Sequence, residues 1–271
     1  AVSDQELNCQ ILVEYAVWRM GPEGGGVLPQ TAGNDMAHLG AVLSIARPAW
    51  GYEVDPQVMG NARKVLRKLG YNMRSRERDR RPTLDELDRL LEYFQSIQDR
   101  RPTSINMLKM TAFALFSTRR QEEITRIKWA DLDAEGSRVL VRDMKNPGQK
   151  IGNDVWCHLP PEALAILQSM PKTVDVIFPY SAESTSASWT RACKFLGIID
   201  LHFHDLRHEG VSRLFEMDWD IPRVASVSGH RDWNSMRRYT HLRGRGDAYE
   251  NWKWLDIVVK APVKLGALTL K

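Results

Sequence analysis

The sequence has little cysteine and no long apolar run. Its cysteines, Cys9, Cys157 and Cys193, lie far apart, and no pair has metal-ligand spacing. An odd number of separated cysteines favours a reducing compartment over a disulfide-built secreted fold. No apolar stretch approaches the ~20 residues that span a bilayer, and the polar start AVSDQELNCQ does not resemble a signal peptide. We therefore expect a cytoplasmic protein without a membrane segment.

Internal repeats and low-complexity segments are also missing. The chain has 271 residues, 43% of them hydrophobic, and its mean hydropathy is −0.40. This length and composition predict one large domain or two smaller ones, each with its own core.

The basic residues are concentrated in one stretch, although the net charge is only +4. Between residues 63 and 81, only Glu77 and Asp79 oppose the arginines and lysines. Such a strip can follow a line of phosphates, or it can be a solvated helix face followed by a charged linker. The candidates for phosphate contact are Arg63, Lys64, Arg67, Lys68, Arg74, Arg76 and Arg78.

The first 75 residues have the apolar periodicity of helices. We expect helices over 5–20 and 31–50, the second with Thr31 as its N-cap, and a third that ends at Gly70. Residues 76–82 have no periodicity and are crowded with charge, which indicates a linker. Residues 83–271 would then form a second domain.

This second domain is predicted to be mainly helical with a small β-hairpin or sheet, an α+β fold. Thr83 and Glu86 have the spacing of a capping box, and a further apolar helix is expected over 104–118. Two β-like runs flank the turn sequence KNPGQ, which predicts a hairpin. PPEALAILQSM predicts a helix, VDVIFPY a short strand or extended segment, and the chain beyond residue 186 more helices.

The segment HFHDLRHEG supports two interpretations. His204 and His208 would share a helix face and, with His202, could form a metal site. Alternatively, His204 and Arg207, three residues apart, would share a face suited to a phosphate.

Other residues in the second domain favour the phosphate. Arg120 is three residues before Glu123, whose carboxylate could hold its guanidinium; Lys145 lies at the hairpin turn; and His230 precedes Tyr239 by nine residues. Arginines can stabilise the charge of a phosphodiester transition state, and histidines can donate to it or move protons. A lysine can protonate the leaving alkoxide, and a tyrosine can attack phosphorus. This chemistry needs no metal and no cofactor.

These residues together resemble the tyrosine recombinases of the phage-integrase type, whose order is Arg, Lys, His-x-x-Arg, His or Trp, then Tyr. The resemblance covers roughly residues 82–243, and the helical first domain is similar to the family's core-binding domain. It implies the catalytic residues Arg120, Lys145, His204, Arg207, His230 and Tyr239. It also implies supporting roles for Glu123, Asp205 and His241.

The resemblance further implies a site-specific recombinase that cuts and rejoins duplex DNA through a 3′-phosphotyrosine. Four protomers would assemble on two sites built of paired inverted half-sites, with possible help from DNA-bending proteins. The tail, about residues 244–271, would exchange onto a neighbouring protomer; packing on its own domain is the alternative. A prokaryotic or phage protein associated with the nucleoid is expected.

Two features depart from the family pattern. Thr118 occupies the position, two residues before the arginine, where the family has Gly; Arg119 and Lys150 are rivals of Arg120 and Lys145. Two alternatives use the same residues, a type IB topoisomerase and a DNA-binding module without catalysis. A metal site would leave Arg120, Lys145 and Tyr239 without a role.

Overall fold

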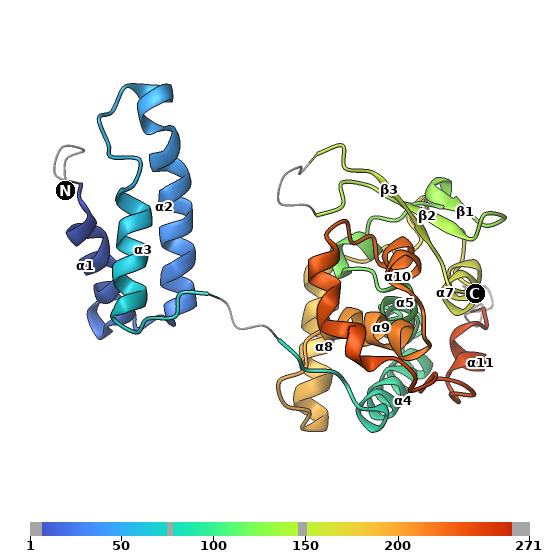
Figure 1. Cartoon of the computed structure of the whole chain (residues 1–271). Helices are drawn as coiled ribbons and strands as arrows, with labels where there is room; N and C mark the ends of the chain where they lie inside the picture. Colours follow the sequence, from blue (N-terminus) through green and yellow to red (C-terminus); the bar gives the residue numbers. More distant parts are fainter. Residues whose placement is uncertain (1–6, 75–77, 146–150, 262–271) are drawn as a thin grey trace, which may run out of the picture. The chain divides into compact units, whose positions relative to one another are not determined.

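The chain divides into two compact units, Ala1–Arg78 and Asp79–Lys271 (Figure 1). The structure is a computed structural model that describes residues 7–74, 78–145 and 151–261. The division falls within residues 76–82, the stretch interpreted above as a linker. Each unit has its own hydrophobic core, so each is described by itself.

The N-terminal unit contains the helices α1 (Cys9–Met20), α2 (Pro29–Trp50) and α3 (Val58–Lys68), with a 3₁₀ turn at Pro22–Gly24. The Asn8 side chain caps α1 by accepting a hydrogen bond from the Ile11 amide. The expected N-cap at Thr31 is wrong, because α2 begins at Pro29, and Thr31 lies within its first turn. Proline fits this first position, since the N–H that it lacks would have no partner within the helix.

Helix α3 separates apolar from basic side chains. Its inner face buries Val58, Met59, Ala62 and Leu66, which join the core of this unit. Its outer positions expose Arg63, Lys64, Arg67 and Lys68 to solvent. The packing of one face therefore presents four cations on the other.

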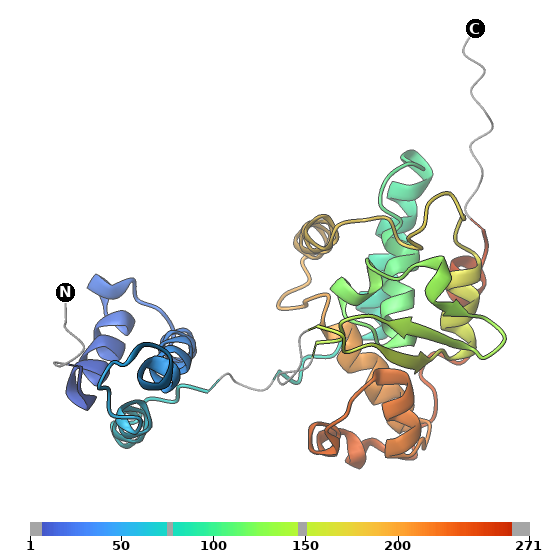
Figure 2. The same cartoon turned by 90° about the horizontal axis from the view of Figure 1, so that it is seen from above.

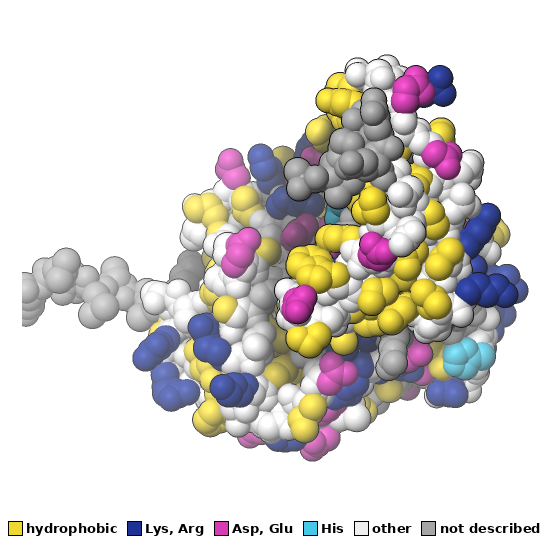
Figure 3. Space-filling model, turned by 90° about the vertical axis from the view of Figure 1, so that its left-hand side faces the viewer, with side chains coloured by type: hydrophobic (Ala, Val, Ile, Leu, Met, Phe, Trp, Pro, Cys, Tyr) yellow, Lys and Arg dark blue, Asp and Glu magenta, His cyan; other side chains and the backbone are white. Residues whose placement is uncertain are grey.

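Helix α1 carries apolar side chains outward as well as inward. Leu12 and Ala16 are buried, whereas Tyr15, Val17 and Trp18 are exposed by 36%, 39% and 49%. Figure 3 looks onto this unit and shows yellow side chains gathered on that face. These outward residues contribute little to the core that holds the three helices together.

The second unit is mostly helical with a three-stranded antiparallel sheet, which confirms the predicted fold class (Figures 1 and 2). The strands are β1 (Leu132–Asp133), β2 (Arg138–Val141) and β3 (Val155–His158). The sheet has the order β1-β2-β3 and pairs Leu132 with Val139 and Val139 with Cys157. VDVIFPY forms no strand; it contributes an isolated bridge between Lys128 and Val176. The helices are α4 (Leu84–Arg100), α5 (Met107–Ser117), α6 (Gln121–Ile124), the 3₁₀ helix η2 (Trp129–Asp131), α7 (Pro161–Gln168), α8 (Ala182–Leu196), α9 (Asp205–Glu216), α10 (Ile221–Ser228), the 3₁₀ helix η3 (Trp233–Leu242) and α11 (Leu255–Val258).

Local signals explain where the main helices begin and how they pack. The Thr83–Glu86 capping box is present at the start of α4. Every residue of α5 is buried, and α9 packs against it in the middle of the unit. Gly210 permits this approach, since a Cβ there would lie 2.1 Å from the Leu115 carbonyl oxygen. Helix α9 is thereby held between α5 and η3.

The segment that precedes residue 262 packs on its own unit. Trp252 and Trp254 both donate from Nε1 to Asp88 Oδ1, at 2.8 and 3.0 Å. The buried ammonium of Lys109 donates to the carbonyl oxygens of Val258 and Lys260. Exchange from residue 244 onward would have to break these contacts, so the structure favours the alternative, own-domain packing, for this stretch. The remainder of the predicted exchange tail, 262–271, lies outside the described residues.

Within the described ranges, no helix combines the length and the apolar character needed to cross a membrane.

Candidate active site

The corner between α5 and α6 sets the direction of two neighbouring arginines. Thr118 ends α5 in the left-handed conformation, with φ of 57° and ψ of 21°. A β-branched residue rarely adopts this conformation, which explains why glycine suits the position. The Thr118 carbonyl oxygen accepts a hydrogen bond from Arg207 Nη1. The turn therefore supplies an anchor for α9 as well as a change of direction.

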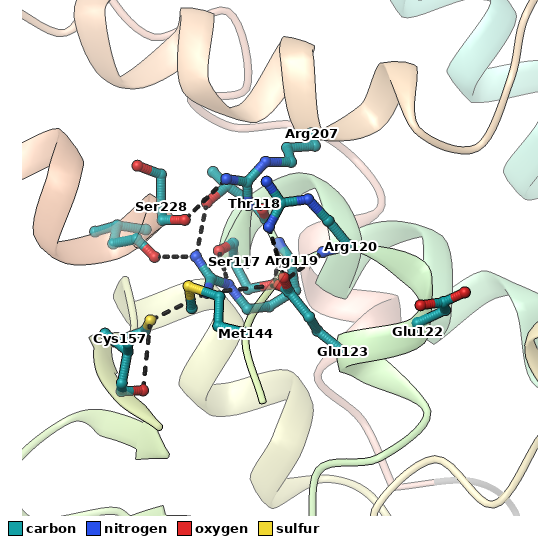
Figure 4. A network of polar contacts seen from close by, with 12 residues as sticks. Ser117, Thr118, Arg119, Arg120, Glu122, Glu123, Met144, Cys157, Arg207 and Ser228 are labelled. Carbon is teal, nitrogen blue, oxygen red and sulfur yellow. Dashed lines mark hydrogen bonds and ion pairs between the residues drawn. The ribbon is translucent and has the colours of Figure 1, made fainter. Parts of the chain in front are cut away.

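Arg119 and Arg120 point to different places (Figure 4). Arg119 is 1% exposed; its guanidinium donates to the carbonyl oxygens of Ser117 and Val227 and lies 3.0 Å from Cys157 Sγ. Arg120 keeps 28% of its side chain exposed and lines a surface hollow. These contacts support Arg120, rather than Arg119, as the arginine that can reach a ligand.

Glu123 holds this corner together electrostatically. Its Oε1 accepts from Arg120 Nη1 at 2.7 Å, and its Oε2 accepts from the Arg120 amide at 3.1 Å. Burial alone would raise the pKa of Glu123, but the nearby Arg119, Arg207 and Arg120 hold it below its usual range. The ionised carboxylate therefore orients the Arg120 guanidinium, the role that the sequence spacing suggested.

Arg207 is built into the protein from α9. Its Nη2 donates to the Ser228 carbonyl oxygen at 3.0 Å and lies 3.2 Å from His230 Nε2. Burial, with repulsion from Arg119 and Arg120, lowers the pKa of Arg207 to about 9, so the group stays charged at neutral pH. Because a guanidinium has only donors, His230 Nε2 accepts this bond, and Nδ1–H donates to Ser228 Oγ at 2.7 Å.

The turn after α10 directs His230 toward Arg207. Gly229 ends α10 with φ of 70°, and a Cβ there would lie 2.6 Å from Met144 Cε. Burial, followed by repulsion from Arg207 and Arg120, lowers the pKa of His230 to about 3. The imidazole of His230 is therefore neutral beside the buried guanidinium of Arg207.

Two adjoining hollows collect most of the predicted catalytic side chains. The larger, about 910 Å³, is lined by Arg120, Lys145 and His204. The smaller, about 190 Å³, is again lined by Arg120 and Lys145, together with His230. Lys145 extends from the segment after β2, and the rival Lys150 lies outside the described residues.

His204 lies at the start of α9, beside His208. The two imidazole rings are perpendicular, with centroids 5.3 Å apart. Partial loss of hydration, then repulsion from His208, Arg207 and Arg120, lowers the pKa of His204 to about 4. Among the described residues, no cluster of three or more His, Cys, Asp or Glu has the geometry of a metal site.

Tyr239 projects from η3 onto α9. It is 8% exposed, and its ring stacks on Phe215 with centroids 5.9 Å apart. Its Oη lies 2.6 Å from His208 Nδ1. Burial raises the pKa of the Tyr239 phenol, although Arg238 and Arg207 oppose this effect. The hydroxyl is therefore protonated at neutral pH and positioned by a histidine.

The other two residues with predicted supporting roles, Asp205 and His241, lie at the start of α9 and in η3. Asp205 Oδ2 accepts from the His202 amide at 2.8 Å and so fixes the first turn of α9. His241 is exposed two residues beyond Tyr239. The residue before the tyrosine, Arg238, forms an ion pair with Asp79.

The basic strip divides between ion pairs and open surface. Arg81 binds the carboxylates of Glu209 and Glu216, with Nε 2.6 Å from Glu209 and Nη1 2.9 Å from Glu216. Arg80 pairs with Glu86. These two arginines, which are not among the candidates for phosphate contact, thus fasten the start of the second unit to α9 and α4.

Part of the strip lines a hollow in the N-terminal unit. Arg63, Arg67 and Arg74 line this space of about 810 Å³ together with Asn34 and Asn72. Lys64 and Lys68 are exposed on α3, and Arg78 is described with intermediate exposure. Arg76 lies outside the described residues. The three arginines form a surface to which a polyanion could bind.

Sequence reasoning missed two participants in this site. His208 was not among the catalytic or supporting residues that the resemblance implied, yet it contacts the Tyr239 hydroxyl. Ser228, which binds His230, was not singled out. The spacing of His208 from His204 indicated a shared face, but only the fold brings η3 against that face.

Comparison with known proteins matches this chain to recombinases and integrases. The model of the Phage integrase family matches residues 80–245. A shufflon-specific DNA recombinase from Escherichia coli is 33% identical over 222 residues, covering 81% of this chain and 53% of that protein. A putative integrase/recombinase from Haemophilus influenzae is 21% identical, covering 76% of this chain and 64% of that protein. The chain thus spans about half to two thirds of the length of these relatives.

Solved structures share the fold. A lambda integrase dimer bound to a COC′ core site has a TM-score of 0.61 at 18% identity, covering 89% of this chain and 66% of that chain. The XerH site-specific recombinase bound to palindromic difH has a TM-score of 0.59 at 18% identity, covering 88% of this chain and 69% of that chain. At such low identity the likeness concerns the fold alone.

Proposed function

The chain belongs to the phage integrase family, and from this premise we propose that it is a site-specific recombinase that breaks and rejoins duplex DNA through Tyr239. The proposal rests on one observation, that side chains from distant segments of the chain lie close together. Arg120 at the start of α6, Lys145 after β2, His204 at the start of α9 and His230 after α10 come from distant parts of the sequence and line two adjoining hollows. The buried Arg207 of α9 contacts His230 beside them.

The proposed roles follow from charge and position. Arg120, oriented by Glu123, and Arg207, oriented by Thr118 and Ser228, bind the nonbridging oxygens of the scissile phosphate. Preorganised cations of this kind stabilise the charge of the pentacoordinate transition state. Lys145 gives a proton to the leaving 5′-oxygen. Tyr239 forms the phosphotyrosine, so the energy of the broken bond is kept for rejoining and no ATP is consumed.

The substrate is a duplex with paired inverted half-sites, bound by four protomers on two sites. The lambda integrase is bound to a COC′ core site and XerH to a palindromic difH substrate, which supports a DNA partner. Arg63, Arg67 and Arg74 supply a phosphate-binding surface in the N-terminal unit. Base readout would select the half-site, because phosphate contacts alone carry no sequence information.

Selection of bound DNA followed by a strand-exchange assay tests this function. DNA captured by the protein from a genomic pool is sequenced, and two copies of the enriched site are then incubated with the protein in EDTA without nucleotide. We expect paired inverted half-sites and recombinant joints. Relaxation of supercoils without a preferred site would instead indicate a topoisomerase, and site binding without any cleavage would indicate a DNA-binding module.

A further inference from the structure

The nucleophile proposed above has a close polar partner on α9. His208 Nδ1 is 2.6 Å from Tyr239 Oη. The partly buried His208 is one residue beyond Arg207, so the helix that presents the arginine to the phosphate also presents this imidazole to the tyrosine. Stacking on Phe215 and burial of Met236 and Leu242 hold η3 in place.

The proton of this pair lies on the tyrosine at neutral pH. Burial raises the pKa of Tyr239. Loss of hydration, followed by repulsion from Arg238, lowers the pKa of His208. The phenol O–H therefore donates to an unprotonated Nδ1, which is the arrangement that a proton acceptor requires.

The charged and titratable groups around His208 come from three segments. Its own helix contributes His204, Asp205 and Arg207, η3 contributes Arg238 and Tyr239, and Asp79 lies before α4. Asp205 and Asp79 raise the pKa of His208, whereas Arg238 and Arg207 lower it. The two carboxylates can thus stabilise the imidazolium that forms when the ring takes a proton.

The other two histidines of the site have different partners. His230 Nε2 accepts from Arg207, and His204 lines the larger hollow with Arg120 and Lys145.

We propose, building on the function above, that His208 is the general base that accepts the Tyr239 proton during DNA cleavage. The Oη–H bond breaks as its proton passes to Nδ1, and the Oη–P bond forms while the bond from phosphorus to the 5′-oxygen breaks. The leaving oxygen takes a proton from Lys145. In the reverse step, the 5′-hydroxyl gives its proton to Lys145 as its oxygen attacks phosphorus, the Oη–P bond breaks, and His208 returns its proton to Tyr239 Oη.

The test compares cleavage by the wild-type protein with that by His208→Asn. Asparagine keeps an acceptor oxygen near the position of Nδ1, so it can hold the phenol, but it cannot take the proton. The substrate is a nicked duplex from which the short fragment that carries the 5′-hydroxyl diffuses away, so that covalent adduct accumulates. The control is His158→Asn, the same change at an exposed position of β3.

We expect His208→Asn to form adduct about 10²–10⁴-fold more slowly, with unchanged DNA affinity and melting temperature. The wild-type rate should fall in the acid range as His208 becomes protonated. The residual rate of the variant should instead rise with pH, because its tyrosinate must form by loss of a proton to solvent. His158→Asn should match the wild type.

A wild-type rate and pH profile in His208→Asn would overturn the assignment of His208 and leave the recombinase proposal intact. If the wild-type protein itself forms no adduct, the proposed function fails and this inference fails with it. Should His208→Asn melt well below the wild type, the pH profile of the wild-type protein decides, and a cleavage rate that does not fall in the acid range overturns the assignment.

Discussion

At the scale of single residues, two adjacent arginines have different surroundings. The left-handed Thr118 turns the chain so that Arg119 enters the interior and Arg120 faces the hollow. Glu123 at the third position after Arg120 indicated this choice from sequence alone. The burial of Arg119 against Cys157 and Val227 could not be predicted, because its partners come from β3 and α10.

Replacement of the two arginines that we propose bind the phosphate, Arg120 and Arg207, should affect protein stability differently. Arg120→Ala should slow cleavage by about 10²–10³-fold, as for loss of one transition-state donor, with little change in melting temperature, because Arg120 is partly exposed. Arg207→Ala should slow cleavage as strongly and also lower the melting temperature. The substitution removes the donor to the Thr118 and Ser228 carbonyl oxygens. Each unsatisfied buried acceptor should lower the free energy of unfolding by about 1–3 kcal/mol.

Adduct formation, DNA binding and thermal melting of the two variants check this difference. Loss of DNA binding equal to the loss of cleavage would assign these arginines to binding rather than to the transition state.

At the scale of elements, α9 connects the core to the site. Its Gly210 touches α5, and its Glu209 and Glu216 bind Arg81. Its Arg207 contacts His230, and its His208 contacts Tyr239. Periodicity and capping predicted most helices and the hairpin, since those signals are local. Local signals could not show that α9 would lie between α5 and η3, because that depends on contacts between distant segments.

Gly210→Ala should destabilise the catalytic unit. The added Cβ would lie 2.1 Å from the Leu115 carbonyl oxygen, and the backbone there cannot move without separating α5 from α9. We expect the free energy of unfolding to fall by at least about 2 kcal/mol, together with reduced cleavage. Gly60→Ala is the matched helical control, because the nearest atom to its added Cβ is Gln57 Oε1, 3.7 Å away. Its free energy of unfolding should rise by up to about 1 kcal/mol, since alanine favours a helix more than glycine does.

Denaturant unfolding of both variants measures these free energies. Equal stability of Gly210→Ala and the wild type would show that α5 and α9 tolerate a wider spacing than the structure has.

At the scale of the whole molecule, the chain combines a small helical unit that exposes cations with a larger unit that contains the proposed catalytic residues. Charge density along the sequence located the strip, but only the fold separates its members. Arg63, Arg67 and Arg74 line an open hollow, whereas Arg80 and Arg81 are held by carboxylates. Which carboxylates would approach Arg81 was invisible in the sequence, because Glu209 and Glu216 are more than a hundred residues away.

Binding of DNA should depend on salt partly through this hollow. Each phosphate contact contributes about −0.9 to the slope of log affinity against log salt, so Arg63→Gln with Arg67→Gln should make the slope shallower by about 2. Lys172→Gln with Lys253→Gln removes the same charge from the catalytic unit and should leave the slope nearly unchanged. Titrations at several salt concentrations give both slopes, and equal slopes for the two double variants would remove the hollow from the DNA interface.

The most direct test of the account is whether Tyr239 becomes covalently joined to DNA. Wild-type protein and Tyr239→Phe are incubated with the nicked substrate, and the products are separated on denaturing gels. We predict that the wild type forms a protein–DNA adduct, with the phosphate mapped to Tyr239 by mass spectrometry, whereas Tyr239→Phe binds the same DNA and forms none. An adduct of undiminished yield with Tyr239→Phe would contradict the central claim.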